Sequence, residues 1–233
     1  MSMLNVSDLV VNRVGLKVVR NANLAVDQGS ISVLLGSNGA GKTTMLEGLS
    51  GTIPVVGGRI ELQGEAIGHI YPGARARQGL AHVEQGRTVF RMLTTDENLR
   101  VASRTADSAR AYEMFPELEK RRHIRAGLLS GGEQQMLVIA RALLTNPKVI
   151  MIDEMSAGLA PVVVGRLMTA VRKLADSGLA VLLVEQFAAL ALAIGDRAYV
   201  MRRGEIVYDG LCHALTKSPD LLHRLYLGEA ETA

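Results

Sequence analysis

The chain has 233 residues, of which 48% are hydrophobic and 21% charged, and its formal net charge is +3 at pH 7. These values allow one domain with a sizeable core and exclude disordered, collagen-like and low-complexity chains. The single cysteine excludes an internal disulfide and favours a reducing compartment. Aromatic residues make up 3% and tryptophan is absent, which argues against a stacking surface for single-stranded nucleic acid.

The first part of the chain predicts short elements around a glycine-rich turn. Residues 3–11 and 16–26 form apolar runs, and SISVLL at residues 30–35 predicts a buried strand that ends at the turn. A helix is expected over residues 43–50. Gly57-Gly58 predicts a turn, followed by a short strand over residues 59–63.

The second part predicts helices alternating with buried strands. The pattern is helical and highly charged over residues 94–125, and a helix with one apolar face is expected over residues 133–144. Apolar runs at 149–152 and 180–184, separated by a helical segment at 161–176, predict parallel strands. A hairpin is expected over 199–208. The last helix begins near Ser218, and its apolar face either packs on its own domain, which we favour, or binds a partner.

No stretch of the sequence predicts a membrane span or a targeting segment. The first residues lack a charged region followed by an apolar one. The longest apolar stretch, residues 179–194, is interrupted by Glu185 and Gln186. If the protein works at a membrane, we expect another chain to cross it.

Residues 36–44 read GSNGAGKTT and match the phosphate-binding pattern G-x-x-x-x-G-K-[ST]. The glycines let backbone N–H groups point inward, and the following helix adds its positive end. Lys42 places a charge on the outer phosphates, and the Thr43 hydroxyl can ligate Mg²⁺. The predicted nucleotide-binding loop therefore comprises Gly36, Ser37, Asn38, Gly39, Ala40, Gly41, Lys42, Thr43 and Thr44.

An acidic pair follows the predicted strand VIMI, where the carboxyl ends of sheet strands hold ligands. Asp153 can hold Mg²⁺ through a water, and Glu154 can orient or deprotonate a water beside the γ-phosphate. The alternative is that the pair only caps the next turn, which the nearby phosphate loop disfavours.

Residues 129–135 read LSGGEQQ, in which Ser130 and Glu133 predict a capping box at a helix start. A capping box rarely needs two glycines, and Gly131 and Gly132 would leave bare N–H groups at a helix N-terminus, which attracts anions. A second anion site in a chain with one phosphate loop indicates a shared nucleotide.

The motifs GSNGAGKTT, LSGGEQQ and VIMIDE, in this order, resemble those of the ATP-binding cassette ATPases over essentially the whole chain. The resemblance implies an α/β P-loop NTPase fold: a RecA-like core with a small antiparallel β-subdomain and an inserted α-helical lobe. Residues 1–233 would form one such domain, with core and β-subdomain at 1–87 and 147–211, helical lobe at 88–146 and tail at 212–233. Two subunits would pack head to tail, each ATP lying between one phosphate loop and the other signature motif.

The same resemblance assigns roles to single residues. Gln85 stands at the Q-loop position, and Gln186 stands where most members have a switch histidine. Glutamine can hydrogen-bond a γ-phosphate but cannot take its proton, so we expect Glu154 to carry more of the hydrolysis. Arg13 is the closest match to the residue that stacks on adenine, with an exposed loop arginine as the alternative. The implied catalytic residues are Glu154, Lys42, Gln85 and Gln186; the metal ligands are Thr43, Gln85 and Asp153; and the signature contacts to the partner's ATP are Ser130, Gly131, Gly132 and Glu133.

A narrower resemblance points to a transport role. GLAHVEQGRTVFRMLTTDENL, SAGLAP, LLVEQ and YLG are similar to motifs of the branched-chain amino-acid importers. This implies an enzyme that uses ATP and Mg²⁺ at the cytoplasmic face of the plasma (inner) membrane, as a peripheral subunit. Its expected partners are permease subunits, a second cassette ATPase in a heterodimer or a homodimer in isolation, and indirectly a solute-binding protein, but no nucleic acid.

Four alternatives stay open from the sequence. They are the ATPase of a urea or short-amide importer, the ATPase of a lipid or lipopolysaccharide exporter, a nucleic-acid or translation ATPase, and a degenerate regulatory subunit. The last two are disfavoured, because no coiled coil splits the cassette and because Lys42, Thr43, Asp153, Glu154 and Ser130 are all present.

Overall fold

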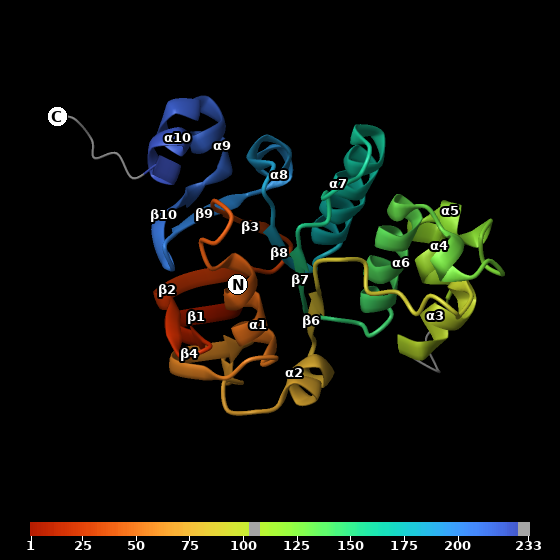
Figure 1. The fold of residues 1–233 in the computed structure, drawn as a ribbon, viewed down its shortest axis with the longest axis horizontal. Helices are drawn as coiled ribbons and strands as arrows, with labels where there is room; N and C mark the ends of the chain where they lie inside the picture. Colours follow the sequence, from red (N-terminus) through yellow and green to blue (C-terminus); the bar gives the residue numbers. More distant parts are fainter. Residues whose placement is uncertain (103–107, 228–233) are drawn as a thin grey trace.

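The computed structural model describes residues 1–102 and 108–227 (Figure 1). Its first half contains the strands β1 (Ser2–Arg13), β2 (Leu16–Asp27), β3 (Ile31–Leu35), β4 (Val55–Leu62), β5 (Glu65–Ala66) and β6 (Leu80–Val83), with the helices α1 (Lys42–Ser50) and α2 (Pro72–Gln78). The helices α3 (Thr95–Ala102), α4 (Ala109–Met114), α5 (Pro116–Glu119) and α6 (Gly131–Leu143) follow, with a 3₁₀ turn at Ala126–Leu128. The remaining elements are β7 (Val149–Asp153), α7 (Pro161–Asp176), β8 (Ala180–Val184), α8 (Ala188–Ile194), β9 (Arg197–Arg202), β10 (Glu205–Leu211), α9 (Cys212–Lys217) and α10 (Pro219–Leu227).

The larger sheet has the strand order β10-β9-β3-β8-β7-β6, in which all neighbours but β10 and β9 pair in parallel. Side chains alternate between its two faces, so each central strand contributes to two apolar clusters. Val181 and Leu183 of β8 join one cluster, whereas Leu182 and Val184 join the other. Because both faces are covered, these strands read as uninterrupted apolar runs, as the sequence predicted.

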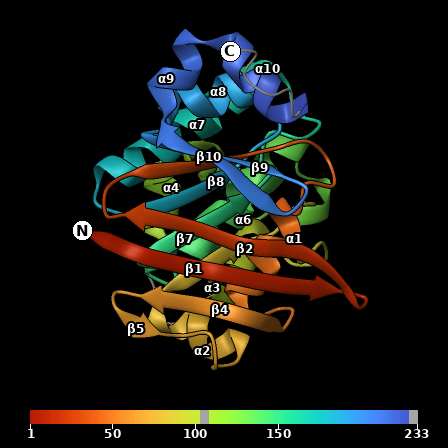
Figure 2. The same ribbon diagram turned by 90° about the vertical axis from the view of Figure 1, so that its left-hand side faces the viewer.

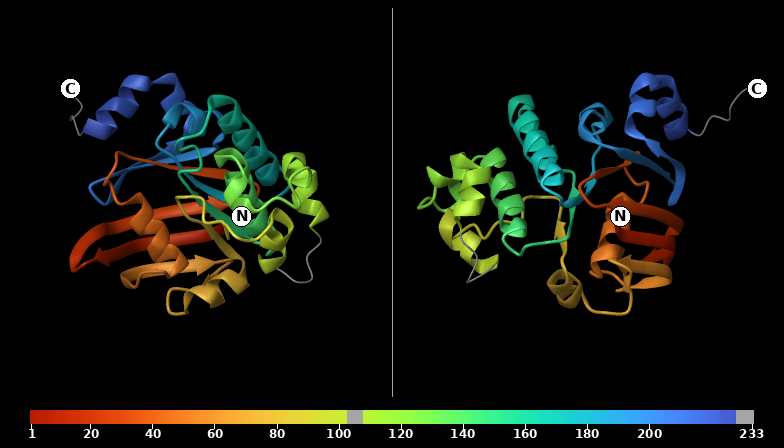
Figure 3. Two further views of the ribbon diagram at one scale, coloured as in Figure 1. Left: turned by 45° about the vertical axis from the view of Figure 1, so that its right-hand side comes forward. Right: turned by 180° about the vertical axis from the view of Figure 1, so that it is seen from behind.

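A second sheet with the order β2-β1-β4-β5 is antiparallel and lies beside the first (Figure 2). The apolar side chains of its strands share a cluster with Met45, Leu46 and Leu49 of α1. Figures 1 and 3 place the helices α3–α6 on the opposite side of the parallel sheet from this antiparallel one. The α/β architecture with a parallel sheet, a small antiparallel sheet and an inserted helical segment is therefore present.

The predicted turn at Gly57-Gly58 is wrong, because both glycines lie inside β4. The register between β1 and β4 shifts between Ser7 and Val10, which makes an irregularity in the ladder. Gly58 has φ +89° there, and a Cβ on it would lie 2.5 Å from the Asp8 carbonyl oxygen. The glycine is needed for a strand irregularity rather than for a chain reversal.

The predicted helical segment over residues 94–125 is correct only in part. The helices α3, α4 and α5 are short, and residues 120–125 form turns that lead to a bridge between Thr94 and Arg125. Residues 103–107 of that prediction lie outside the described residues. The predicted helix at 133–144 is present as α6, and the hairpin at 199–208 is present as β9 and β10.

The last helix, α10, begins with Pro219 as predicted. Its apolar residues pack against the cluster that contains the central strands, so the expected packing on the chain's own domain is confirmed; these residues are Leu221, Leu222, Leu225 and Tyr226. Within residues 1–102 and 108–227, no helix has both the length and the apolar character to cross a bilayer.

Candidate functional site

The phosphate loop connects β3 to α1 at the carboxyl edge of the parallel sheet. Gly41 precedes α1 with φ +109°, which lets the loop turn directly into the helix. A Cβ on Gly36 would lie 2.4 Å from the Met201 carbonyl oxygen of β9. The loop is therefore held against the sheet at a distance that only a glycine permits.

Lys42, the first residue of α1, is folded back onto the loop, and its side chain is buried. Its Nζ donates to the carbonyl oxygens of Gly36 at 2.8 Å and Ser37 at 3.3 Å, and it lies 3.9 Å from Oε1 of Glu154. Burial lowers the pKa of Lys42, while the carboxylates of Glu154, Asp153 and Glu185 oppose this shift. A phosphate group entering the loop would offer this ammonium group a better partner than neutral carbonyls.

Asp153 ends β7 and is 1% exposed, yet neither of its carboxylate oxygens has a hydrogen-bond partner of normal geometry among the described residues. Burial raises the pKa of Asp153 to about 6, against a lowering by the nearby Thr43 hydroxyl. Two unpaired buried oxygens are costly for a structural carboxylate. Unpaired carboxylate oxygens at this position are expected if Asp153 binds a cation.

Glu154 and Gln85 meet above the loop, although they are 69 residues apart in the chain. Nε2 of Gln85 donates to Oε2 of Glu154 at 2.6 Å. Glu154 has φ +46°, and its backbone N–H donates to the Val184 carbonyl oxygen at 2.9 Å. The left-handed backbone at Glu154 directs the chain away from β7 while the carboxylate stays beside Lys42, which is typical of a functional position.

A pocket of about 380 Å³ lies over these groups, and its lining includes Lys42, Thr43, Gln85 and Glu154. The oxygens of Thr43, Asp153 and Gln85 are hard ligands of the kind that Mg²⁺ prefers. The unpaired carboxylate of Asp153 is the observation that fits a cation here. The pocket thus offers a lysine, a helix N-terminus and oxygen donors for a metal-bound polyphosphate.

Arg13 lines the same pocket and forms an ion pair with Glu47 of α1. Its Nη1 also lies 3.5 Å from Oγ1 of Thr44. The structure thus brings Arg13 to the loop, with its guanidinium held over α1. Gln186, by contrast, is exposed after β8 and has no side-chain hydrogen bond within the described part of the chain, and it does not line this pocket.

The signature residues form the start of α6, where the predicted capping box is confirmed. The Ser130 hydroxyl accepts from the Glu133 N–H at 3.3 Å, and the Glu133 carboxylate accepts from the Ser130 N–H at 2.8 Å. Within the described residues this leaves the N–H groups of Gly131 and Gly132 without a partner. None of these residues lines the phosphate pocket of the same chain.

Three contacts of the site were not found from the sequence. Glu185 is fully buried and accepts from the Ser156 N–H at 3.1 Å and from the Ser156 hydroxyl at 2.5 Å. Arg87 donates to the Ala157 carbonyl oxygen at 2.8 Å. The third contact is the Arg13–Glu47 pair. The partners are distant in the chain and follow no motif, so only the fold could reveal them.

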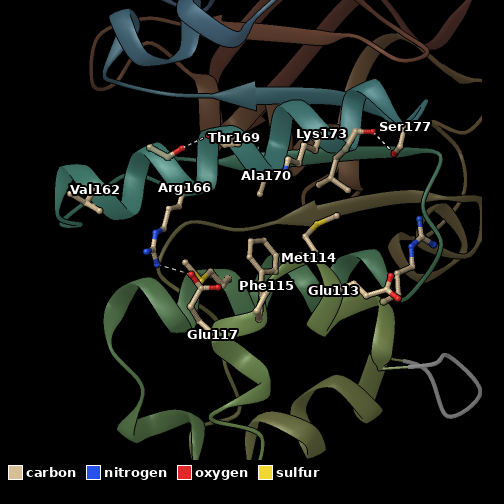
Figure 4. A pocket seen from close by; sticks show the side chains of 15 residues that line it. Glu113, Met114, Phe115, Glu117, Val162, Arg166, Thr169, Ala170, Lys173 and Ser177 are labelled. Atoms are coloured by element: carbon tan, nitrogen blue, oxygen red, sulfur yellow. Dashed lines mark hydrogen bonds and ion pairs between the residues drawn. The ribbon is translucent and has the colours of Figure 1, made fainter.

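A cavity of about 810 Å³ lies elsewhere, between α7 and the helices α4 and α5 (Figure 4). Arg166 of α7 and Glu117 of α5 form an ion pair across it at 2.6 Å. Its lining shares no residue with the phosphate pocket, although it is the larger of the two. Size therefore does not identify the site of chemistry in this molecule.

Comparison with known proteins gives consistent results. A family model described as ABC transporter matches residues 19–157. The high-affinity branched-chain amino acid transport ATP-binding protein BraG of Pseudomonas aeruginosa is 38% identical over 220 residues, which cover 91% of this chain and 94% of that protein. The lipopolysaccharide export system ATP-binding protein LptB of Escherichia coli K12 is 34% identical over 238 residues, covering 98% of both chains. The crystal structure of the ADP conformation of MJ1267, an ATP-binding cassette of an ABC transporter, superposes with a TM-score of 0.86 at 25% identity, covering 98% of this chain and all of that one.

Proposed function

The chain belongs to the ABC transporter family and is an ATP-binding cassette ATPase, and from this premise we propose that it powers the uptake of branched-chain or other hydrophobic amino acids through partner permeases. The observation that carries the enzymatic part is the meeting of Lys42, Asp153 and Glu154 at one edge of the sheet. The match to BraG over nearly the full length of both chains supports the transported class.

The proposed ATP site uses the phosphate loop, residues 36–44, with Lys42 on the outer phosphates. Thr43, Asp153 and Gln85 would hold Mg²⁺, which supplies charge neutralisation between the phosphates. Glu154 orients the attacking water and draws its proton, helped by the Gln85 hydrogen bond that aims the carboxylate. Gln186 is exposed one residue after the buried Glu185. It would reach the γ-phosphate only after a side-chain movement.

We assign the adenine contact to Arg13, whose guanidinium is fixed by Glu47 beside the phosphate loop. A planar guanidinium can stack on a base in place of an aromatic ring. Ser130, Gly131, Gly132 and Glu133 would bind the ATP of a partner subunit. The free N–H groups at the start of α6 support this, because they are absent from the phosphate pocket of their own chain.

Residues 1–233 would form one cassette domain. Residues 1–87 and 147–211 form the core with its β-subdomain, 88–146 the helical lobe and 212–233 the tail. The protein would work as a peripheral subunit at the cytoplasmic face of the plasma (inner) membrane. Its partners would be permease subunits and a second cassette ATPase, with a solute-binding protein acting through the permeases.

We expect the permease to bind at a cavity of about 470 Å³ between β6 and α6, whose lining ends next to Gln85 in the chain. Its lining combines apolar side chains with two polar groups that lack hydrogen-bond partners among the described residues, namely His82 and Nη1 of Arg141. Phe90 at its rim is 48% exposed. A short segment of another chain could fill this groove and pair with the polar groups.

The first experiment is to purify the tagged chain from gently solubilised membranes of its native cells and to identify its partners by mass spectrometry. Two polytopic permeases and a second cassette ATPase are expected. The solute-binding protein found with them would then be titrated with leucine, isoleucine, valine, urea and short amides. Binding of urea or an amide, but of no hydrophobic amino acid, would overturn the proposed solute.

A second candidate is an exporter of lipid or lipopolysaccharide, favoured by the match to LptB over 98% of both chains. The same purification separates the two, because exporter subunits would come without a solute-binding protein. Recovery of ribosomal or chromosomal proteins without any membrane partner would contradict both candidates and leave only the ATPase.

A further inference from the structure

Arg87 lies in the segment after β6, two residues beyond Gln85, and takes a left-handed backbone conformation with φ +55°. Its Nη2 donates to the carbonyl oxygen of Ala157 at 2.8 Å and lies 3.5 Å from that of Gly158. These carbonyls belong to the loop that follows the proposed catalytic Glu154. The segment 85–87 thus contacts Glu154 through the Gln85 side chain and the loop after Glu154 through the Arg87 side chain.

The other side of the Arg87 guanidinium rests against Gly131, the first residue of α6. A Cβ on Gly131 would lie 2.7 Å from Nη1 and 3.0 Å from Cζ of Arg87. Gly131 therefore has a second role besides its free N–H group. It leaves the space that the guanidinium occupies between α6 and the loop at 157–158.

This placement is not explained by helix stability. The N-terminus of α6 carries partial positive charge, so a cation beside it is unfavourable, whereas Glu133 in the first turn is the usual favourable choice. Arg87 is kept there by its carbonyl acceptors, in spite of the helix end and of the left-handed backbone that the position requires. Because Arg87 stays beside the helix N-terminus in spite of this repulsion, we look for its role in the contacts that it makes outside α6.

We propose that Arg87 is a positioning residue that fixes the signature end of α6 to the loop following Glu154, so that the two halves of the proposed ATP machinery within one subunit move as a unit. The inference rests on the proposed ATPase dimer. It goes beyond that proposal by naming the side chain that couples the two motifs. Arg87 does not line the phosphate pocket, so its effect on nucleotide should be indirect.

The variants Arg87→Ala and Arg87→Lys test this in the full chain. We expect Arg87→Ala to lower kcat for ATP about 10-fold or more, since small misplacements of catalytic groups are costly. The Kd of the isolated chain for a fluorescent ATP analogue should stay within about twofold, because the phosphate loop is untouched. Arg87→Lys should restore part of kcat, because an ammonium group can bond one carbonyl but cannot fill the planar gap beside Gly131.

Arg91→Ala is the matched control. Arg91 lies in the same segment and is exposed, and its side chain has no hydrogen bond or ion pair within the described residues. Its loss removes the same charge without touching the loop at 157–158. Thermal unfolding of all variants checks that the fold is kept.

A double-mutant cycle with Gly131→Ala sharpens the test. The added methyl group should displace the guanidinium in the wild-type background, and it should cost less kcat in the Arg87→Ala background. Independent, multiplicative effects would overturn the coupling. So would equal kcat values for Arg87→Ala and Arg91→Ala in a preparation whose wild type hydrolyses ATP. A wild type without hydrolysis would instead count against the proposed function itself.

Discussion

The edge of the parallel sheet that carries the phosphate loop and the helices α3–α6 are built by different interactions. The central strands β3, β7 and β8 are buried over their whole length and supply both apolar clusters. The helices share one of these clusters, but toward the site and toward α7 they are joined by arginine side chains. Arg87 bonds the loop at 157–158, and Arg166 pairs with Glu117.

The difference shows which part of the molecule can hold catalytic groups in a fixed geometry and which part can shift. Apolar packing at full density resists displacement, so groups attached to the ends of β3 and β7 keep their geometry. A polar contact at the surface is weak and can be remade after a small shift. Catalytic carboxylates therefore belong on the sheet. A single surface pair such as Arg166–Glu117 allows the helices to shift against α7, whereas Arg87 keeps the signature end of α6 with the loop at 157–158.

The largest expected effect comes from the sheet edge itself. Glu154→Gln keeps the size of the side chain and an oxygen that can accept from Gln85, but it removes the proposed base. We expect kcat to fall by roughly 10²–10⁴-fold, as measured by phosphate release at saturating ATP. Glu65→Gln on the exposed strand β5 is the control. A larger loss for Gln186→Ala than for Glu154→Gln would contradict the proposed division of work.

The next effect concerns the link between β8 and the loop after Glu154. Ser156→Ala removes a hydroxyl that donates to the buried carboxylate of Glu185. We expect a loss of about 1.5–3 kcal/mol in the free energy of unfolding, since the carboxylate keeps only backbone donors. Ser30→Ala, at a half-buried position directly before β3, should cost far less, because the Ser30 hydroxyl donates to a neutral carbonyl oxygen. Equal losses of unfolding free energy for the two variants, measured by chemical denaturation, would show that the hydrogen bond to the buried carboxylate stabilises the fold no more than the one to a carbonyl oxygen.

The sequence predicted those parts of the site that follow from local pattern. The strand before GSNGAGKTT, the strand before Asp153 and the capping box at Ser130 all have residue types that allow few other conformations. A phosphate loop needs no distant partner to form its nest of N–H groups. The alternation of buried strands with helices predicted parallel strands, and the resemblance to the ATP-binding cassette ATPases added the fold class with its β-subdomain and helical lobe.

The parts that could not be predicted depend on distant partners. Gly57-Gly58 reads as a turn, and only the pairing of β4 with β1 makes it a strand irregularity. Strand β6 reads LAHV, with a large apolar residue only at each end. Four such residues show no alternation from which a strand could be predicted. The contacts of Arg87 with α6 and with the loop at 157–158 join segments that are distant in the chain, so the sequence could not predict them.

A third prediction tests the border between the two regions through His82 of β6. Burial lowers the pKa of His82 from 6.5 to about 4, with Glu47 opposing the shift. The unfolded chain takes up a proton below pH 6.5, but the folded one does not until about pH 4. His82 therefore does not lower the free energy of unfolding above pH 6.5. As the pH falls below 6.5 this free energy decreases, by about 2 kcal/mol at pH 5.

The pH dependence of unfolding is compared between the wild type and His82→Gln. The variant should lose this part of the dependence, because glutamine does not titrate. Arg141 of α6 and Glu84 line the same cavity as His82, so a protonated His82 would add a second positive charge to that lining. His123→Gln on a surface turn serves as control. An unchanged slope in His82→Gln would place the acid sensitivity elsewhere.

The smallest effect is expected where the helices meet α7. Arg166 and Arg172 lie on the same helix, but the exposed Arg166 bonds only Glu117 among the described residues. Arg172 donates to the carbonyl oxygen of Ile194 and to two carboxylates. Arg166→Met should lower the free energy of unfolding by less than about 1 kcal/mol. Arg172→Met should cost about 1–3 kcal/mol, because it removes several hydrogen bonds at once, to Asp176, to Asp196 and to the Ile194 carbonyl oxygen. If chemical denaturation gave the two variants equal losses, the Arg166–Glu117 pair would hold α5 to α7 as firmly as Arg172 holds its several partners, and the contrast between a single surface pair and a network of contacts would fail.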